Sequence, residues 1–288
     1  MIYTVFINPS HTVVINPSYA VAAAAGRDHH LLIRPGGSVE AYGANSFGQC
    51  NVPPGLTATV VGCGEYHSLA IRPNGSVVAW GKNSNGQCNV PSGLTAIAVD
   101  GSSTASLAIR SDGSVAQWGH LCQWYIAPGP PAGLEATDIA CGYNMAAALR
   151  PDGTVIAWGG NDVSNFGSGT VKSGLTDAVS ISCGYHVAAL REDGSIMAWD
   201  PSGYSCEIPV EAIAVASTLS DLYALLPGGL VAYWDFTWKD MNLEPTIIPG
   251  LRATTLAVHF WNFVAIGEWA GDRRRRAAWM DLERSVYF

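Results

Sequence analysis

The histidines and cysteines are the residues of this chain whose types could support metal binding or nucleophilic catalysis. Cys63, Cys141 and Cys183 each stand directly before a glycine, and His67 and His186 closely follow two of those glycines. Thiolates and neutral imidazoles are common metal ligands, and either can act in catalysis beside a suitable acid or base. The chain has no CxxC pair and no ligand pair at helical or hairpin spacing, so we predict no metal site, no cofactor and no catalytic residues.

These residues belong to a sequence repeat, which favours a structural role for them. The last apolar residue before a turn recurs about every 40 residues, at Ile33, Ile71, Ile109, Leu149, Leu190, Leu225 and Ile266. When a residue type recurs at the same position of the repeat, the structure that the copies share is enough to explain it. We therefore interpret the recurring cysteines as small buried apolar residues and each recurring histidine as bonded to a neighbouring backbone group.

The most regular copy, residues 64–91, indicates which elements position these side chains. SLAIR and SVVAW are rich in strand-forming residues, and the Pro73, Asn74 and Gly75 between them suit a tight turn. The Cys-Asn-Val-Pro segment that follows can form only a short outer strand, because Pro91 has no N–H to donate. We expect the tryptophans that close the second strand to pack between neighbouring units, namely Trp80, Trp118, Trp158 and Trp199.

Seven units made only of strands and turns predict an all-β fold, a seven-bladed β-propeller of four-stranded antiparallel blades. The segments GxxHSLAIRPDGSVxAWG and GQCNVP resemble the repeat of the regulator of chromosome condensation family, over roughly residues 12–280, and the short helix-free form is similar to β-lactamase inhibitor protein II. The resemblance implies seven four-stranded blades that bind partner proteins through their loops. One fold serves many functions, so the motif is more specific for fold than for function.

The whole chain, residues 1–288, is predicted to form one domain. Residues 1–18 are an N-terminal segment, residues 19–280 hold the seven repeats and residues 281–288 are a C-terminal tail. Residues 12–17 resemble the Cys-Asn-Val-Pro segment that ends each unit. We therefore expect residues 12–16 to pair with the strand at residues 277–280 and to close the ring as its outer strand, because a closed ring leaves no open sheet edge.

The composition argues against several classes of partner. A net charge of −8 opposes binding to nucleic acid or to an anionic membrane. The four arginines at residues 273–276 are for that reason interpreted as a solvated, enlarged turn. No apolar run reaches the ~18 residues of a membrane span, and the N-terminus lacks the basic start of a signal peptide. We expect a cytoplasmic monomer.

Hairpin geometry places the loop before each hairpin and the loop after it on one face, opposite the tight turns. These loops vary between units, and variable loops on a rigid scaffold are where binding sites are built. They are rich in the aromatic anchors of protein interfaces, with acidic groups around them that would steer a basic partner. The predicted partner-binding residues are Arg27, Asp28, Phe47, Glu65, Tyr66, Lys82, Trp124, Tyr125, Tyr143, Asn144, Asp162, Tyr185, Tyr204, Phe236, Trp238 and Trp261.

The leading hypothesis is therefore a non-enzymatic module that binds a partner protein through this face, with enzyme inhibition as one specific form. A second hypothesis is that the central opening binds a small molecule or glycan, or hydrolyses a substrate. It would require convergent polar groups with shifted pKa values at that opening. A repeat protein with no dedicated partner is a third.

Overall fold

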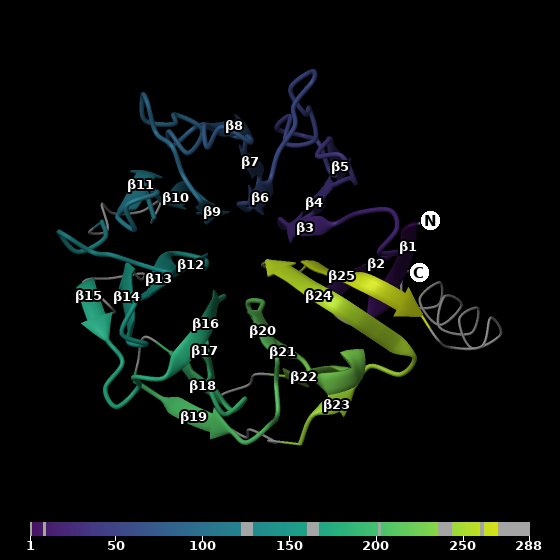
Figure 1. Ribbon diagram of the computed structural model, residues 1–288, viewed down its shortest axis with the longest axis vertical. Helices are drawn as coiled ribbons and strands as arrows, with labels where there is room; N and C mark the ends of the chain where they lie inside the picture. The colour runs from purple at the N-terminus through teal and green to yellow at the C-terminus, as the bar shows by residue number, and fades with distance from the viewer. Residues whose placement is uncertain are drawn as a thin grey trace.

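The computed structural model describes residues 2–7, 10–121, 129–159, 167–200, 203–235, 244–259 and 262–269. The strands of these residues form seven sheets that follow one another around a common centre (Figure 1). The helical structure of the described residues is limited to the 3-10 turn η1 (Pro227–Gly229). The all-β architecture predicted from the sequence is thus confirmed.

Each sheet starts with the strand nearest the centre and continues outward through a hairpin (Figure 1). The first three sheets are β3 (Ala22–Ala25), β4 (His29–Ile33) and β5 (Val39–Gly43); β6 (Val60–Cys63), β7 (His67–Ile71) and β8 (Val77–Gly81); and β9 (Ala98–Gly101), β10 (Ala105–Ile109) and β11 (Val115–Gly119). The next three are β12 (Asp138–Cys141), β13 (Met145–Leu149), β14 (Val155–Gly159) and β15 (Gly167–Val171); β16 (Ala178–Cys183), β17 (Val187–Arg191), β18 (Ile196–Trp199) and β19 (Ser205–Ile208); and β20 (Ala214–Ser217), β21 (Asp221–Leu225), β22 (Val231–Asp235) and β23 (Thr246–Ile247). The last sheet contains β24 (Leu251–His259), β25 (Asn262–Trp269), β2 (Ser10–Ile15) and β1 (Ile2–Ile7).

The second strand of most sheets is covered on both faces, which explains its composition. Every residue of β4, β7, β10, β13 and β21 is buried. Strands covered on both faces are near-continuous apolar runs rather than alternating ones. The turn that follows β7 is set by local chemistry, because the Asn74 side chain accepts hydrogen bonds from the Ser76 N–H at 3.1 Å and hydroxyl at 2.7 Å, while Gly75 supplies a φ of +83°.

The tryptophans fill the space between neighbouring sheets, as predicted. Trp118 shares an apolar cluster with Leu69 and Ile71 of the preceding sheet, and Trp158 shares one with Leu107 of the sheet before it. The residues Trp80, Trp118, Trp158 and Trp199 are all buried. These contacts place most of the core between sheets, so each sheet depends on both neighbours.

Near the centre, neighbouring sheets approach so closely that only glycine fits. A Cβ atom at Gly64 would overlap the carbonyl oxygen of Ser102, and one at Gly184 would overlap that of Thr218. The loops before successive hairpins also bond to one another, as in the 3.2 Å hydrogen bond from the Glu65 N–H to the Ser102 carbonyl. The glycines at these two positions are therefore a packing requirement of the inner ring.

The first three sheets have three strands, so the prediction of four-stranded blades is wrong for them. The segment from Cys88 to Pro91, where the outer strand was expected, forms no strand, and only an isolated bridge between Ser76 and Thr95 lies beyond it. In the second sheet the loop folds back instead: the Asn83 side chain donates to Asn89 at 2.8 Å and accepts from the Cys88 N–H at 2.9 Å. This loop geometry, together with the missing N–H of Pro91, replaces strand pairing.

The N-terminal segment joins the last sheet, but with a different partner from the one predicted. Strand β2 pairs in parallel with β25, with Thr12 opposite Phe263 and Ile15 opposite Ile266. Strand β1 pairs with the other side of β2. The predicted partner, residues 277–280, lies outside the described residues and is wrong as the neighbour of residues 12–15. The physical reason is that β1 and β2 form their own hairpin, which adds to the edge of β25 as a unit.

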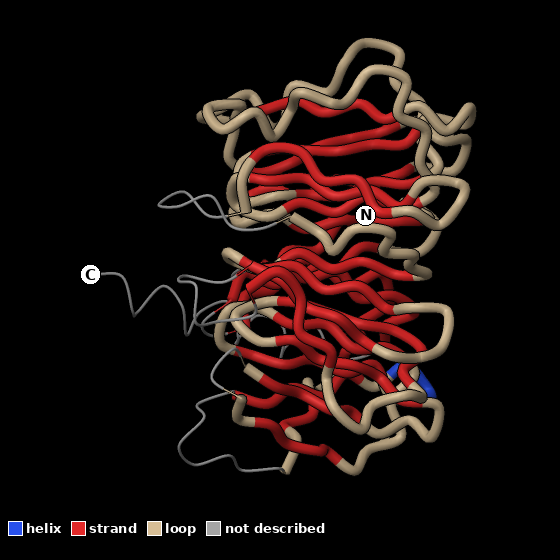
Figure 2. Tube along the Cα trace, turned by 90° about the vertical axis from the view of Figure 1, so that its left-hand side faces the viewer, coloured by secondary structure: helices blue, strands red, loops and turns tan. Residues whose placement is uncertain are grey.

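The loops gather at the two ends of the strands, as the side view shows (Figure 2). We call the end with the loops before and after the hairpins the loop face; it includes residues 26–28, 44–51, 64–66 and 82–91. The end with the tight turns is the turn face; it includes residues 35–37, 73–75, 111–113, 151–153 and 192–194. In the part of the chain that the structure describes, no helix has the length and apolar character needed to cross a bilayer.

Candidate partner-binding surface

Six of the predicted residues meet on the loop face and form what we call the Tyr66 cluster. They are supplied by the loops around the hairpins β4–β5 and β7–β8. The members are Arg27, Asp28, Phe47, Glu65, Tyr66 and Lys82. Loops from before and after the hairpins contact each other here, which confirms for these two units that both kinds of loop share one face.

Arg27 and Glu65 fix the position of the Tyr66 side chain. Arg27 Nη1 lies 2.6 Å from Glu65 Oε1 and donates a hydrogen bond to the Tyr66 hydroxyl at 2.7 Å. The hydrogen bond to Glu65 is the main cause that raises the pKa of Arg27. Burial is the main cause that raises the pKa of Tyr66. At neutral pH the guanidinium is therefore charged, and the phenol keeps its proton.

Phe47 and Lys82 complete the cluster around the tyrosine ring. The Phe47 and Tyr66 ring centroids are 5.0 Å apart and the rings are tilted by 53°. Lys82 Nζ lies 5.1 Å from the Phe47 centroid and 5.0 Å from the Tyr66 centroid. Both distances suit cation–π attraction. Phe47 is 47% exposed, so the cluster offers an aromatic surface next to an ammonium group.

Buried glutamines, which were not among the predicted site residues, hold the loops of the cluster in place. Gln49 is 1% exposed, and its side-chain oxygen accepts the Phe47 N–H at 2.9 Å. The Gln49 carbonyl accepts hydrogen bonds from the Ser68 hydroxyl and the Trp80 indole, both at 2.8 Å. Gln87 repeats the arrangement in the next unit. The repeated Gly-Gln-Cys triplet was the sequence signal for this role.

The recurring histidines belong to the same internal network. His29 Nε2 lies 3.1 Å from the Ser68 hydroxyl, and His67 Nε2 lies 2.8 Å from the Ser106 hydroxyl of the following sheet. Burial is the main cause that lowers the pKa of His29 to about 4. The predicted structural role is confirmed. The predicted backbone partner is present for His29, which has a backbone hydrogen bond at His67. A serine hydroxyl also lies beside Nε2 of both histidines.

The other described members of the predicted set lie elsewhere on the molecule. Tyr143, Tyr185 and Tyr204 are exposed, at 37%, 46% and 69%. Asn144 is buried at 7% exposure, which leaves too little of its side chain for a partner to contact, and we remove it from the candidate surface. The remaining predicted residues lie outside the described residues; they are Trp124, Tyr125, Asp162, Phe236, Trp238 and Trp261.

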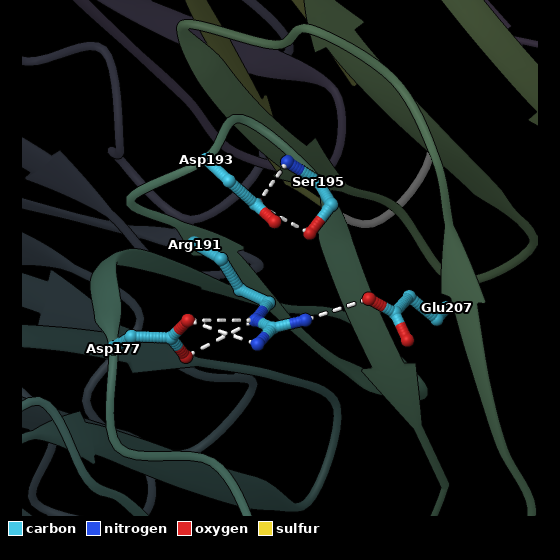
Figure 3. Close-up of polar contacts among 5 residues, drawn as sticks. All are labelled: Asp177, Arg191, Asp193, Ser195 and Glu207. Atoms are coloured by element: carbon cyan, nitrogen blue, oxygen red, sulfur yellow. Dashed lines mark hydrogen bonds and ion pairs between the residues drawn. The ribbon is translucent and has the colours of Figure 1, made fainter.

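The turn face differs in that its charges are satisfied locally, as the fifth sheet illustrates. Arg191 is held by Asp177 through two atoms, at 3.0 Å from Nε and 2.9 Å from Nη2, and its Nη1 lies 2.6 Å from Glu207 (Figure 3). Asp193 is occupied by the Ser195 N–H and hydroxyl, at 2.8 and 2.6 Å (Figure 3). Such side chains stabilise the turn and leave little free charge for a partner.

Two partly buried carboxyl groups lie on innermost strands, and both have structural partners. Asp100 accepts the Cys141 N–H of the next sheet at 2.7 Å, and Asp138 accepts the Ile181 N–H of the sheet after that at 3.2 Å. Burial is the main cause that raises the pKa of Asp100 to about 7. These side chains cap the inner edges of their neighbours. Among the described residues, no group of three His, Cys, Asp or Glu side chains could hold a metal ion.

Comparison with known families identifies the repeat. The family model of the regulator of chromosome condensation (RCC1) repeat matches residues 59–87 and 136–165. The match covers two segments of the chain. The first begins just before β6 and runs through Gln87, so it contains the Glu65–Tyr66 half of the cluster and Lys82. A search of curated protein sequences finds no match.

Solved structures support the same fold. Human WBSCR16 has a TM-score of 0.72 at 18% identity, with 90% of each chain covered. Prp20p from Saccharomyces cerevisiae, described with its binding to Gsp1p and histones, has a TM-score of 0.69 at 19% identity, covering 90% of this chain and 85% of that one. The CRINKLY WD40 ectodomain of the Arabidopsis thaliana receptor kinase ACR4 has a TM-score of 0.59 at 17% identity, covering 78% and 83%. At such identities the likeness concerns the fold alone, which is a β-propeller.

Proposed function

We propose that this protein is a non-enzymatic interaction module that binds a partner protein through its loop face, centred on the Tyr66 cluster. The observation that carries the proposal is the cluster itself. An exposed Phe47, a fixed Tyr66 and two cations are supplied by four separate loops. Aromatic and arginine side chains on a pre-ordered surface are the usual anchors of protein interfaces.

The comparisons make this proposal consistent with what related propellers do. Prp20p is described with Gsp1p and histones as its binding partners, and also in complex with Kap60. We extend protein binding in general to this chain, and not those partners. Inhibition of an enzyme remains one specific form of the proposal. It is a form that a rigid loop face could take, because a binding surface that is ordered beforehand loses little entropy on association.

We also propose that the seven sheets are the seven blades of a closed ring. In support, the hairpin of β1 and β2 adds to β25, so residues near both ends of the chain share the last sheet. Inner strands of successive sheets are in contact around the centre, including β24 with β3. The closed ring would make the loop face rigid, which is what a binding scaffold requires.

The central opening offers a weaker alternative. The polar groups with shifted pKa values nearest to it, Asp100 and Asp138, accept backbone N–H groups of the next sheet. Their position and their pKa values are therefore explained by strand capping, without a substrate.

The test starts from partners captured by chemical crosslinking in a lysate of the source organism and then expressed in pure form. Loss of an anchor residue typically costs ~2 kcal/mol or more in binding, so Tyr66→Ala should weaken the affinity of a true partner about 30-fold. The turn-face variants Asn74→Ser and Asp152→Asn should leave it unchanged. If a turn-face variant abolishes binding and Tyr66→Ala does not, the face is wrong.

A further inference from the structure

We infer that the Tyr66 cluster recognises an acidic side chain of the partner, whose carboxylate binds Lys82 while a neighbouring apolar group of the partner packs on Phe47. This inference rests on the proposed function and specifies the chemistry of the partner. Its basis is a difference between the two cations of the cluster, Arg27 and Lys82.

Arg27 is neutralised within the cluster. Its guanidinium contacts Glu65 at 2.6 Å and Asp28 at 3.6 Å, and it also donates to the Tyr66 hydroxyl. Glu65 is largely covered, with a side chain 12% exposed. Both carboxylates of the cluster thus pair with Arg27, and the Asp28 side chain stays 47% exposed. Within this cluster, the acidic groups that suggested a basic partner from sequence are engaged by Arg27.

Lys82 is the cation whose charge the cluster does not neutralise. In the described part of the chain, no carboxylate forms an ion pair with it. Its neighbours are the faces of the Phe47 and Tyr66 rings, at 5.1 and 5.0 Å. Ring faces attract the ammonium but accept no full N–H bond, so its hydrogen-bonding capacity is available to an incoming acceptor.

The backbone of Lys82 is also held in position before any partner arrives. The Lys82 N–H donates to the Tyr66 carbonyl at 3.0 Å, and the Lys82 carbonyl accepts the Cys88 thiol at 3.2 Å. Phe47 is held by Gln49 through its backbone. An ammonium that projects from an ordered loop and lies beside a half-exposed ring fits a carboxylate next to an apolar side chain, because charge-assisted hydrogen bonds strengthen where apolar groups exclude water.

The chemistry favours a protein carboxylate over the phosphates of a nucleic acid. Backbone phosphates are bound by many cations arranged along a groove. Here the Tyr66 cluster offers one unneutralised lysine, on a chain of net charge −8. A single ion pair with an adjacent apolar contact is the pattern of an acidic residue in a protein interface.

The experiment selects peptides from a random 12-residue phage-displayed library on the intact protein and then measures their affinities by biolayer interferometry. We expect enrichment of Asp or Glu beside an aromatic or aliphatic residue. Lys82→Gln should weaken these peptides about tenfold or more, because a hydrogen bond to a charged group is lost, and Lys82→Arg should retain most of the affinity. Lys172→Gln is the matched control, since Lys172 also lies over an aromatic ring, 5.7 Å from the centroid of Trp199.

The outcomes separate the inference from the proposed function. Peptides that depend on Phe47 and Tyr66, but lack acidic residues or tolerate Lys82→Gln, would overturn the inference and leave the loop-face proposal standing. Peptides insensitive to Phe47→Ala and Tyr66→Ala would overturn both, as would the absence of any selected binder. Thermal melting of every variant checks that the fold is intact.

Discussion

Buried ionisable side chains act in opposite directions on the stability of this protein. Burial lowers the pKa values of His29 and His30 to about 4 and of His186 to about 3. These histidines stabilise the fold above pH 6.5, and that stabilisation is lost as the pH falls toward 4. Asp100 does the reverse, because its pKa is raised to about 7. The contribution of Asp100 to the free energy of unfolding is complete below pH ~4 and is lost as the pH rises through 7.

Asp100→Asn should therefore change stability in a pH-dependent way. At pH 8 the wild-type carboxyl must be charged while enclosed, whereas the amide is neutral and its oxygen can still accept the Cys141 N–H. We expect a higher melting temperature than wild type at pH 8 and no gain at pH 4.5. Thermal denaturation followed by circular dichroism at both pH values measures this, and an equal gain at both would contradict the role assigned to the carboxyl charge.

Trp158 is the residue whose truncation should cost most. Its side chain is fully buried between sheets, and its indole N–H donates to the Gln117 side chain at 3.0 Å. We expect Trp158→Ala to lower the free energy of unfolding by ~3–5 kcal/mol, measured by urea denaturation. Tyr204→Ala, at a side chain that is 69% exposed, is the control and should have little effect. Unchanged stability of Trp158→Ala would disprove the packing role.

At the scale of the elements, the contacts between innermost strands govern the architecture. Side chains such as Asp100 and Ser182 reach the backbone N–H groups of the next sheet, at 2.7 and 2.8 Å. Glycines before the hairpins allow this approach. The hairpins themselves are local structures, but their spacing around the centre depends on these inner contacts.

Gly184→Ala should test whether the fold depends on the close spacing of the innermost strands. A methyl group at this position meets the backbone carbonyl of Thr218, which cannot move without displacing β20. We expect a lower melting temperature and a shallower denaturation curve. Gly129→Ala is a fair comparison, because a Cβ there meets nothing within 4 Å and its φ is not in the left-handed region. Equal effects of the two variants would argue against close packing at the centre.

At the scale of the whole molecule, the last sheet is the element that joins segments from near both ends of the chain. It combines β24 and β25 with the N-terminal hairpin, and Ile15 at the end of β2 is fully buried. Without β2, strand β25 would present an unpaired edge, which invites pairing with other chains.

Deleting residues 1–15 should therefore lower the melting temperature and promote association, visible by light scattering during heating. Deleting residues 1–9 removes β1 but leaves β2 on β25, so the effect should be clearly smaller. If both shortened chains melt like the full chain and stay dispersed, the hairpin does not close the last sheet.

The sequence by itself determined the local structure. The turn residues Asn74 and Gly75 set the hairpin, the apolar runs of the second strands required cover on both faces, and the recurring Trp and His were correctly assigned to the interior. These features follow from local propensity and from the repeat, so they can be predicted without knowledge of distant contacts.

The tertiary structure decided what depends on the meeting of separate units. Which loop residues would form a cluster could not be known, because Arg27 and Lys82 come together only through the placement of two sheets around the centre. The same holds for β2, whose partner is β25, and for the outer strands missing from the first three sheets. The pairing of an outer segment depends on whether it bonds better to a sheet edge or within its own loop. These interaction energies depend on contacts that form only when the sheets have assembled, so they cannot be read from the sequence.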